Sequence, residues 1–134
     1  MKKLIRFGVS LDEDLLKTFD GIIKRNRYPN RSKALAGIIQ QHVTEKAWDD
    51  NKEVFGAFTM AYDHHRRLLV NKLLEIQHDY HDIILSSQHL HITHDVCLEI
   101  VAVRGKGRRI KDILDKIRSQ KGVLHATFIE SLPV

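Results

Sequence analysis

The chain has 134 residues, of which 43% are hydrophobic and 29% are charged, as in a folded protein of one ordinary domain or two small ones. No apolar run approaches the roughly 20 residues of a membrane-spanning helix, and the start of the chain lacks the apolar core of a signal peptide. The single cysteine, Cys97, cannot form an internal disulfide. We therefore expect a cytoplasmic protein without membrane association.

The net charge of +5 is concentrated in the first third of the chain. Residues 1–46 hold ten basic and five acidic side chains, whereas residues 47–134 hold twelve of each. A basic unit joined to a neutral one is typical of a head that binds a polyanion and a body with a separate task. The predicted organisation is a head over 1–48, a polar linker over 49–53 and a body over 54–134.

Residues 4–11 alternate apolar and polar side chains, which predicts a short strand. Its two faces carry Ile5, Phe7 and Val9, and Arg6, Gly8 and Ser10. Ser10 or Asp12 is expected to cap the helix that follows, and Asn30 or Ser32 a second helix after the turn at Pro29. The head is therefore expected to contain one strand and two helices.

Three such elements in about 46 residues bury too little apolar surface to be stable alone, so we expect an obligate dimer. Pairing of the two strands would form an antiparallel ribbon, which fits the DNA major groove and presents Arg6, Gly8 and Ser10 from each chain. The second helix would offer its first amides to a phosphate, together with Asn30, Arg31 and Ser32. The alternative is a dimerisation arm with ordinary surface charge. The order of elements, and the opening of the second helix, resemble the ribbon-helix-helix repressors.

The body has the pattern βαββαβ, the split βαβ or ferredoxin-like arrangement. Strands are expected near residues 54–62, 83–92, 97–103 and 123–129, with helices over about 66–80 and between Gly107 and Gly122. The whole chain is thus predicted to be α+β.

The pattern His89-Leu90-His91 places two imidazoles on one face of a strand, because side chains alternate along it. If residues 93–96 contain a hairpin turn, Cys97 returns beside them. Two imidazoles and a thiolate are ligands for a borderline-soft late transition metal, not for calcium or magnesium. Glu99 shares the face of Cys97 and could orient a ligand imidazole, or be a solvated strand residue. Several other histidines have no assigned role at this stage: His64, His65, His81 and His94.

The basic head, polar linker, βαββαβ body and His-x-His-x5-Cys motif together resemble the nickel-responsive transcriptional regulators, the NikR family. That resemblance implies a square-planar Ni2+ site formed by His89, His91 and Cys97, with His78 supplied by a neighbouring subunit. It also implies a homotetramer, a dimer of dimers, with four ACT-type regulatory domains at its centre and two DNA-binding dimers outside. Copper should bind such a site too.

Two departures from the family concern the head. Members commonly carry Glu and Asp on the second helix, where they join a weaker cation site, but here the matching residues are Lys33 and Gly37. We expect that site to be absent or altered. Gly8 and Ser10 also stand where many members have Thr, so the operator sequence cannot be taken from relatives.

The main hypothesis is a nickel-dependent DNA-binding repressor of nickel uptake or nickel-enzyme genes, acting on palindromic half-sites of double-stranded DNA. The alternative is a nickel or transition-metal binding or storage protein without specific DNA binding. An enzyme using Cys97 and His94 is a third hypothesis, but the sequence shows no separate general base or substrate pocket. We therefore expect no catalytic activity.

Overall fold

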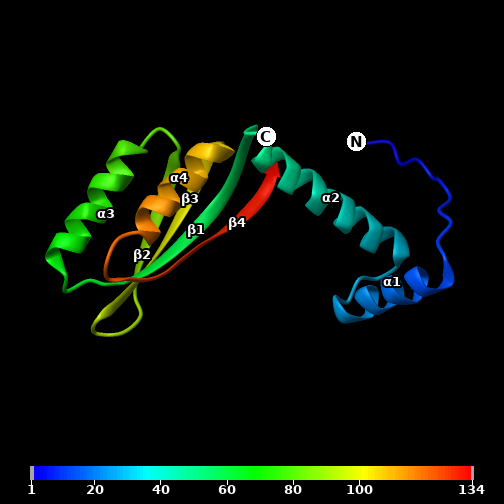
Figure 1. Ribbon diagram of the computed structural model, residues 1–134, viewed down its shortest axis with the longest axis horizontal. Helices are drawn as coiled ribbons and strands as arrows, with labels where there is room; N and C mark the ends of the chain where they lie inside the picture. Colours follow the sequence, from blue (N-terminus) through cyan, green and yellow to red (C-terminus); the bar gives the residue numbers. More distant parts are fainter. Residues whose placement is uncertain (1, 134) are drawn as a thin grey trace. The chain divides into compact units, whose positions relative to one another are not determined.

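The computed structural model describes residues 2–133 and divides into two compact units, Met1–Ile39 and Gln40–Val134 (Figure 1). The division lies within the second helix, earlier in the chain than the boundary expected after residue 48. Within the described residues, no helix is both long enough and apolar enough to cross a membrane.

Both helices of the first unit begin at a side-chain cap. Helix α1 (Glu13–Arg25) follows Asp12, whose Oδ1 accepts a hydrogen bond from the Leu15 amide at 2.8 Å. Helix α2 (Arg31–Asp49) follows Asn30, whose Oδ1 accepts one from the Lys33 amide at 2.9 Å. A carboxylate or amide oxygen in this position satisfies an amide that has no partner within the helix. Of the paired candidates in the sequence, the caps are therefore Asp12 and Asn30.

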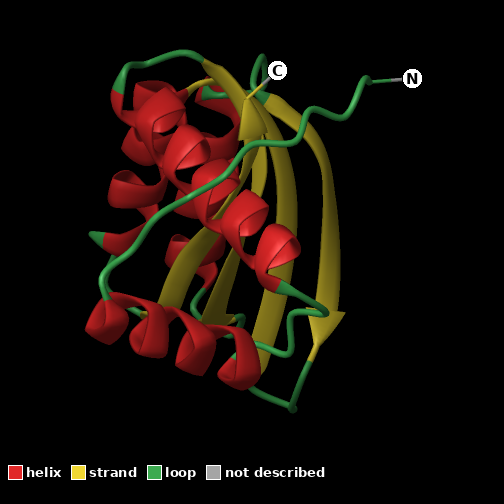
Figure 2. Ribbon diagram, turned by 90° about the vertical axis from the view of Figure 1, so that its right-hand side faces the viewer, coloured by secondary structure: helices red, strands yellow, loops and turns green. Residues whose placement is uncertain are grey.

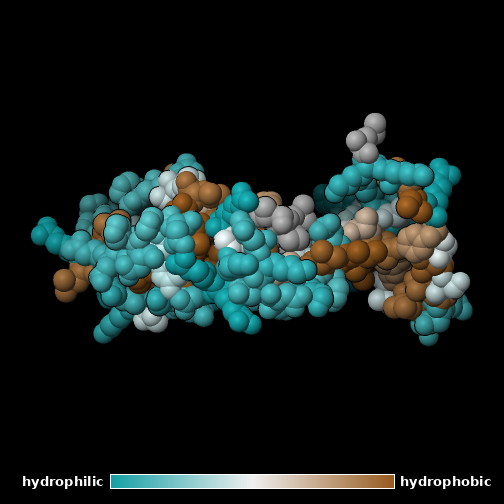
Figure 3. Space-filling model, turned by 90° about the horizontal axis from the view of Figure 1, so that it is seen from above, coloured by the Kyte–Doolittle hydropathy of each residue, from teal (hydrophilic) through white to brown (hydrophobic). Residues whose placement is uncertain are grey.

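The strand expected over residues 4–11 is not formed in the single chain, where this segment has no helix or strand. Its apolar side chains are exposed, with Leu4 94% and Phe7 72% accessible. The physical reason is that a strand needs a partner for its backbone hydrogen bonds, and the expected partner is a second chain. Figure 3 shows apolar side chains gathered on the surface of this unit. There the segment and both helices line a mainly apolar groove of about 1190 Å³.

The second unit confirms the βαββαβ order. Its elements are β1 (Glu53–Asp63), α3 (Arg67–Asp79), β2 (Ile84–His91), β3 (Val96–Lys106), α4 (Gly107–Arg118) and β4 (Val123–Pro133). The strands form one antiparallel sheet in the order β2-β3-β1-β4, as expected for a ferredoxin-like domain (Figure 2). Strands β3 and β4 extend beyond the predicted ranges, and the linker expected at 49–53 is a short turn, since α2 runs to Asp49 and β1 begins at Glu53.

Helices α3 and α4 pack on one face of this sheet and bury it (Figure 1). Alternate residues of β3 from Cys97 to Val103 are buried on that face, as are Phe58 and Met60 of β1. The core is completed by the apolar faces of the helices, including Leu73, Ile113 and Ile117. Cys97 is the first residue of this buried row, so the fold places its sulfur at the end of the core.

Candidate metal centre

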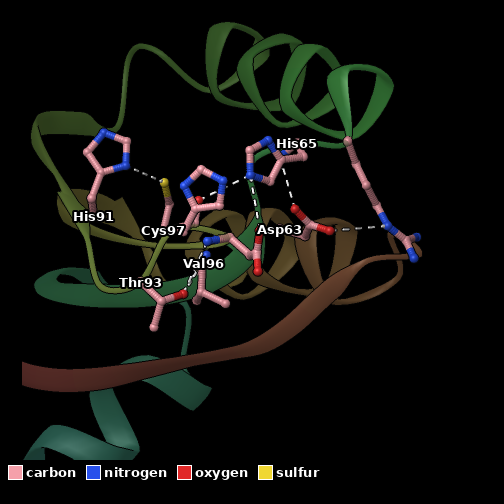
Figure 4. Close-up of polar contacts among 9 residues, drawn as sticks. Asp63, His65, His91, Thr93, Val96 and Cys97 are labelled. Atoms are coloured by element: carbon pink, nitrogen blue, oxygen red, sulfur yellow. Dashed lines mark hydrogen bonds and ion pairs between the residues drawn. The ribbon is translucent and has the colours of Figure 1, made fainter.

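The turn between β2 and β3 brings the cysteine back beside a histidine, as the sequence predicted. Strand register pairs His91 with Cys97, and His91 Nδ1 lies 3.4 Å from Cys97 Sγ (Figure 4). Thr93 fixes the turn, because its Oγ1 accepts hydrogen bonds from the Asp95 and Val96 amides at 3.2 and 3.0 Å. A threonine hydroxyl that satisfies two turn amides stabilises a tight reversal of the chain. The spacing of His91 and Cys97 is thus set by a reversal of the chain over the five residues between them.

A third donor, His64, comes from the residue that follows β1. The amide of His64 donates to the Asp95 carbonyl at 3.1 Å, which fastens this segment to the β2–β3 turn. The ligand atoms of His64, His91 and Cys97 all lie within 4.8 Å of one another. His64 Nδ1 is buried and has no hydrogen-bond partner among the residues that the structure describes. A buried imidazole nitrogen without a partner, close to a thiol and a second imidazole, is suited to bind a metal ion.

His64 was not among the candidate ligands taken from the sequence. Its position follows from sheet order, because β1 lies next to β3 and Asp63 pairs with Val96. The residue after Asp63 therefore reaches the turn that carries His91. Strand order is not visible in the local sequence pattern, although the ferredoxin-like prediction already implied that β1 and β3 are neighbours.

His89 and His78 lie outside this three-donor group. His89 is paired with Glu99, two residues along β2, and its ring stacks on that of His91 with centroids 5.4 Å apart. His78 is in the last turn of α3, exposed, and stacked on His81 at 5.8 Å. Within residues 2–133 of one chain, His78 joins no group of metal-binding side chains. This observation does not test whether His78 binds the metal ion of a neighbouring subunit, which stays a prediction.

The electrostatics of the centre are set by burial and by one carboxylate. Burial of Cys97, and then the neighbouring negative charge of Glu99, raise the pKa of the thiol. Tyr62 pairs with Cys97 across β1 and β3, and its hydroxyl donates to Glu99 Oε2 at 3.2 Å. Burial and the same carboxylate raise the pKa of this phenol as well. The raised pKa values favour the protonated forms of both the thiol and the phenol. A metal ion that binds Cys97 must therefore displace the thiol proton.

Glu99 is buried, with 7% of its surface exposed, so it is not the solvated strand residue considered as an alternative. Its carboxylate accepts from Tyr62 and lies opposite His89 in the β2–β3 register. A buried carboxylate next to candidate ligands is the usual means of orienting an imidazole at a metal site.

The donor set fits a late transition metal. Two ligand atoms held about 2.0 and 2.3 Å from one ion lie roughly 3.0–3.5 Å apart. The observed separation of 3.4 Å between Sγ and Nδ1 falls in this range. One sulfur and the imidazole nitrogens favour a borderline-soft divalent cation over calcium or magnesium. The residues present can therefore hold such an ion with little movement of the hairpin.

The residues expected to contact DNA lie in the first unit. Arg6, Gly8 and Ser10 are exposed in the segment without regular structure. Arg31 is engaged by Asp20, with its Nε and a terminal nitrogen donating to the two carboxylate oxygens at 3.0 and 2.9 Å. This pair lowers the pKa of the Asp20 carboxyl.

The side chains at the start of α2 differ in whether they are free to contact DNA. The Asn30 side chain is used as the cap of α2, whereas Ser32 is exposed. Gly37 lies under the Tyr28 ring, since a Cβ there would be 2.8 Å from the phenolic oxygen. Any side chain added at that position would therefore require Tyr28 to shift.

Residues 55–129 match the family model described as the NikR C-terminal nickel-binding domain. The chain is 50% identical over 127 residues to a protein of Syntrophus aciditrophicus, covering 95% of this chain and 93% of that protein. It is 42% identical over 128 residues to a protein of Desulfovibrio desulfuricans, covering 96% and 93%. Both relatives carry the provisional name nickel-responsive regulator.

Among solved structures, an uncharacterized protein from Thermotoga maritima is similar with a TM-score of 0.55 and 14% identity, over 59% of this chain and 98% of that chain. That likeness shows a shared fold alone. The family match, in contrast, spans β1 through β4 and includes every donor of the metal centre. The chain therefore belongs to the family of nickel-responsive regulators, and its C-terminal domain binds Ni2+.

Proposed function

We propose that this protein is a nickel-dependent DNA-binding repressor that controls genes for nickel uptake or nickel enzymes. The observation that carries the proposal is the approach of His91 Nδ1 to Cys97 Sγ at 3.4 Å, inside a domain of the nickel-binding family. When bound, nickel would supply a positive charge and a fixed ligand geometry that join the β2–β3 hairpin to its neighbours.

For the nickel site we propose His89, His91 and Cys97 of one chain, with Glu99 beside them. His78 is proposed as the fourth ligand, supplied by a neighbouring subunit. Two observations support this choice: His78 is exposed at the end of α3, and its ring joins no ligand group of its own chain within residues 2–133. A ligand shared between chains makes nickel binding and assembly depend on each other.

For the first unit we propose a ribbon-helix-helix dimer. The exposed apolar segment and the groove of about 1190 Å³ support it, because a unit of this size cannot be stable with so much apolar surface in water. A second chain pairing with residues 4–11 would cover that surface. Arg6, Gly8 and Ser10 would then line the DNA side of the ribbon, and α2 would direct its first amides, near Ser32, to a phosphate.

The two units together lead us to propose a homotetramer, a dimer of dimers. Two DNA-binding dimers would grip two palindromic half-sites when nickel orders the regulatory domains between them. By linkage, DNA must then tighten nickel binding by the same factor as nickel tightens DNA binding.

The direct test of the nickel site is an absorption titration of the apo protein with one equivalent of Ni2+ per chain. We expect a thiolate-to-nickel charge-transfer band in the near ultraviolet that Cys97→Ala abolishes. His125→Ala is the matched control, since this exposed histidine of β4 belongs to no donor group formed by the described residues. A band unchanged by Cys97→Ala would exclude the proposed ligand set.

The fourth ligand can be assigned by mixing two defective chains. His78→Ala and Cys97→Ala should each lose the band alone, whereas mixed oligomers should regain part of it, because the second variant still supplies His78 to the first. If His64 of the same chain is the fourth ligand instead, His78→Ala will keep the band and His64→Ala will lose it. That result would overturn the shared site.

Regulation is tested by selecting DNA from genomic fragments with and without nickel. We expect sequence-specific, salt-sensitive binding that requires nickel and is lost in Cys97→Ala. Arg6→Ala should weaken specific binding and leave the nickel band intact. Nickel binding without any sequence preference for DNA would identify a storage protein and refute the regulator.

A further inference from the structure

The end of α3 carries two rings in opposite environments. Tyr80, the residue that follows the helix, is 5% exposed and belongs to the core, whereas His78 is exposed. Side chains two residues apart on a helix do not share a face, so a buried Tyr80 turns His78 outward. The backbone between them is closed, since the Tyr80 amide donates to the Gln77 carbonyl at 3.1 Å and the His81 amide to the His78 carbonyl at 3.2 Å. The position of the His78 ring therefore depends on how firmly Tyr80 is held.

Helix α4 holds Tyr80 by its hydroxyl group. Tyr80 Oη donates a hydrogen bond to a carboxylate oxygen of Asp112. Such a bond to a charged acceptor is stronger than one between neutral groups. Removing the acceptor would leave the hydroxyl of a buried residue without its partner, which costs more free energy than the bond itself contributes. The bond therefore joins the end of α3 to the middle of α4.

Two cations of α4 lie over the same ring. Arg109 Cζ is 5.0 Å and Lys116 Nζ is 4.9 Å from the centroid of the Tyr80 ring. Both lie within the distance of about 6 Å at which a cation is attracted to an aromatic face. Arg109 also forms an ion pair with Asp82, in the turn that leads from α3 to β2, and Lys116 Nζ is 3.8 Å from Asp112. Each exposed ion pair is weak alone, but together they hold both Tyr80 and the turn after it against α4.

We propose that Tyr80 is a positioning residue that favours Ni2+ over Zn2+: anchored on α4, it fixes the direction in which His78 is offered to a neighbouring subunit. The inference rests on the proposed role of His78 as the fourth nickel ligand. Ni2+ favours a planar or tetragonal set of ligands, whereas Zn2+ has no geometric preference from its d electrons. Loosening Tyr80 should therefore lower the affinity for Ni2+ more than the affinity for Zn2+.

The test compares the affinities of the full chain for Ni2+ and for Zn2+, each measured by competition with a chelator. Tyr80→Phe keeps the ring and removes the hydroxyl. We expect it to weaken Ni2+ binding about tenfold, the lower end of the roughly 10–100-fold lost when a partner of a metal ligand is removed, and to change Zn2+ binding much less. Asp112→Asn, whose amide oxygen can still accept the bond, should keep more of the Ni2+ affinity than Asp112→Ala. Tyr28→Phe removes a phenol from the first unit and should change neither affinity.

The second half of the test uses chains that carry His78→Ala. There Tyr80→Phe should have no further effect on Ni2+ affinity, because it acts through the missing imidazole. Urea unfolding of the apo protein checks that each variant is folded. Equal losses of Ni2+ and Zn2+ affinity in Tyr80→Phe would show a merely structural role and overturn the inference. An unchanged Ni2+ affinity, or an effect that persists without His78, would overturn it as well.

The outcome for His78→Ala separates this inference from the proposed function. If His78→Ala leaves Ni2+ affinity intact, the proposed fourth ligand is wrong, and the role of Tyr80 is wrong with it. If His78→Ala weakens Ni2+ binding and Tyr80→Phe does not, the ligand stands and only the positioning role is refuted.

Discussion

Nickel affinity should depend on pH with a slope set by the thiol of Cys97. The side chain is buried and lies beside Glu99, and both effects raise its pKa above the ordinary value of a cysteine. At neutral pH nearly every apo chain therefore carries a proton on Sγ, which the metal must displace. One displaced proton makes the association constant rise about tenfold for each pH unit below the thiol pKa, or roughly 1.4 kcal/mol per unit.

The assay is a competition titration against a chelator of known proton affinity, between about pH 7 and 8.5, in which the near-ultraviolet band reports occupancy. Calorimetry in two buffers of different ionisation enthalpy should give one proton released from the thiol per nickel. Glu99→Gln should keep the hydrogen bond to Tyr62 yet lower the thiol pKa, because the neighbouring negative charge is gone. A pH-independent affinity would refute the reasoning, since it would mean that Cys97 is not a ligand or is already a thiolate in the apo protein.

Three further predictions concern stability and charge. Gly107→Ala should lower the free energy of unfolding in urea by about 1–3 kcal/mol, because the new Cβ would lie 2.6 Å from a backbone carbonyl oxygen at the end of α2. Gly21→Ala should instead raise the free energy of unfolding by about 0.5–1 kcal/mol, because Gly21 is in a helix with open space around it. Asp20→Asn should raise non-specific DNA affinity roughly severalfold at low salt, because it releases Arg31 and removes a negative charge, and anisotropy titrations against salt would show no change if the pair is irrelevant. Apo stability should fall above about pH 8.5, because the raised pKa of Cys97 favours the protonated thiol in the folded state; the loss should continue as pH rises through the folded-state pKa, and Cys97→Ala should flatten this part of the denaturation profile.

The fold of the second unit was largely predictable from periodicity. Alternation over β1 and β3, and helical spacing over α3 and α4, identified elements whose order permits few topologies. The residues at which the strands end were less predictable. Strand β4 runs to Pro133, well past the residue at which the apolar alternation stops, because pairing with β1 supplies its hydrogen bonds. Such pairing is a tertiary contact and leaves little trace in local composition.

The first unit shows the opposite case. For each of its helix caps the sequence left two candidates, and the structure selects Asp12 and Asn30, which act on amides three positions away. Its strand was predicted from the same kind of local alternation, but it is not formed in the single chain, and the partner that we propose for it is a second chain. The exposed Leu4 and Phe7 mark this dependence directly. Alternation shows that a segment can pair, not that its partner lies in the same chain.

The metal centre contains contacts that follow from local sequence and contacts that follow from strand order. The pairing of His91 with Cys97 follows from a hairpin and is local, so the sequence predicted it. His64 and His65 reach the same end of the sheet through the neighbouring strand, so only the topology brings them to the turn. The consequence is that one short turn contributes to two groups of candidate ligand atoms: one that includes the buried thiol, and an exposed one that includes a carboxylate. If nickel binds at this turn, its affinity depends on the β2–β3 hairpin, so we expect substitutions that loosen the turn at Thr93 to weaken nickel binding.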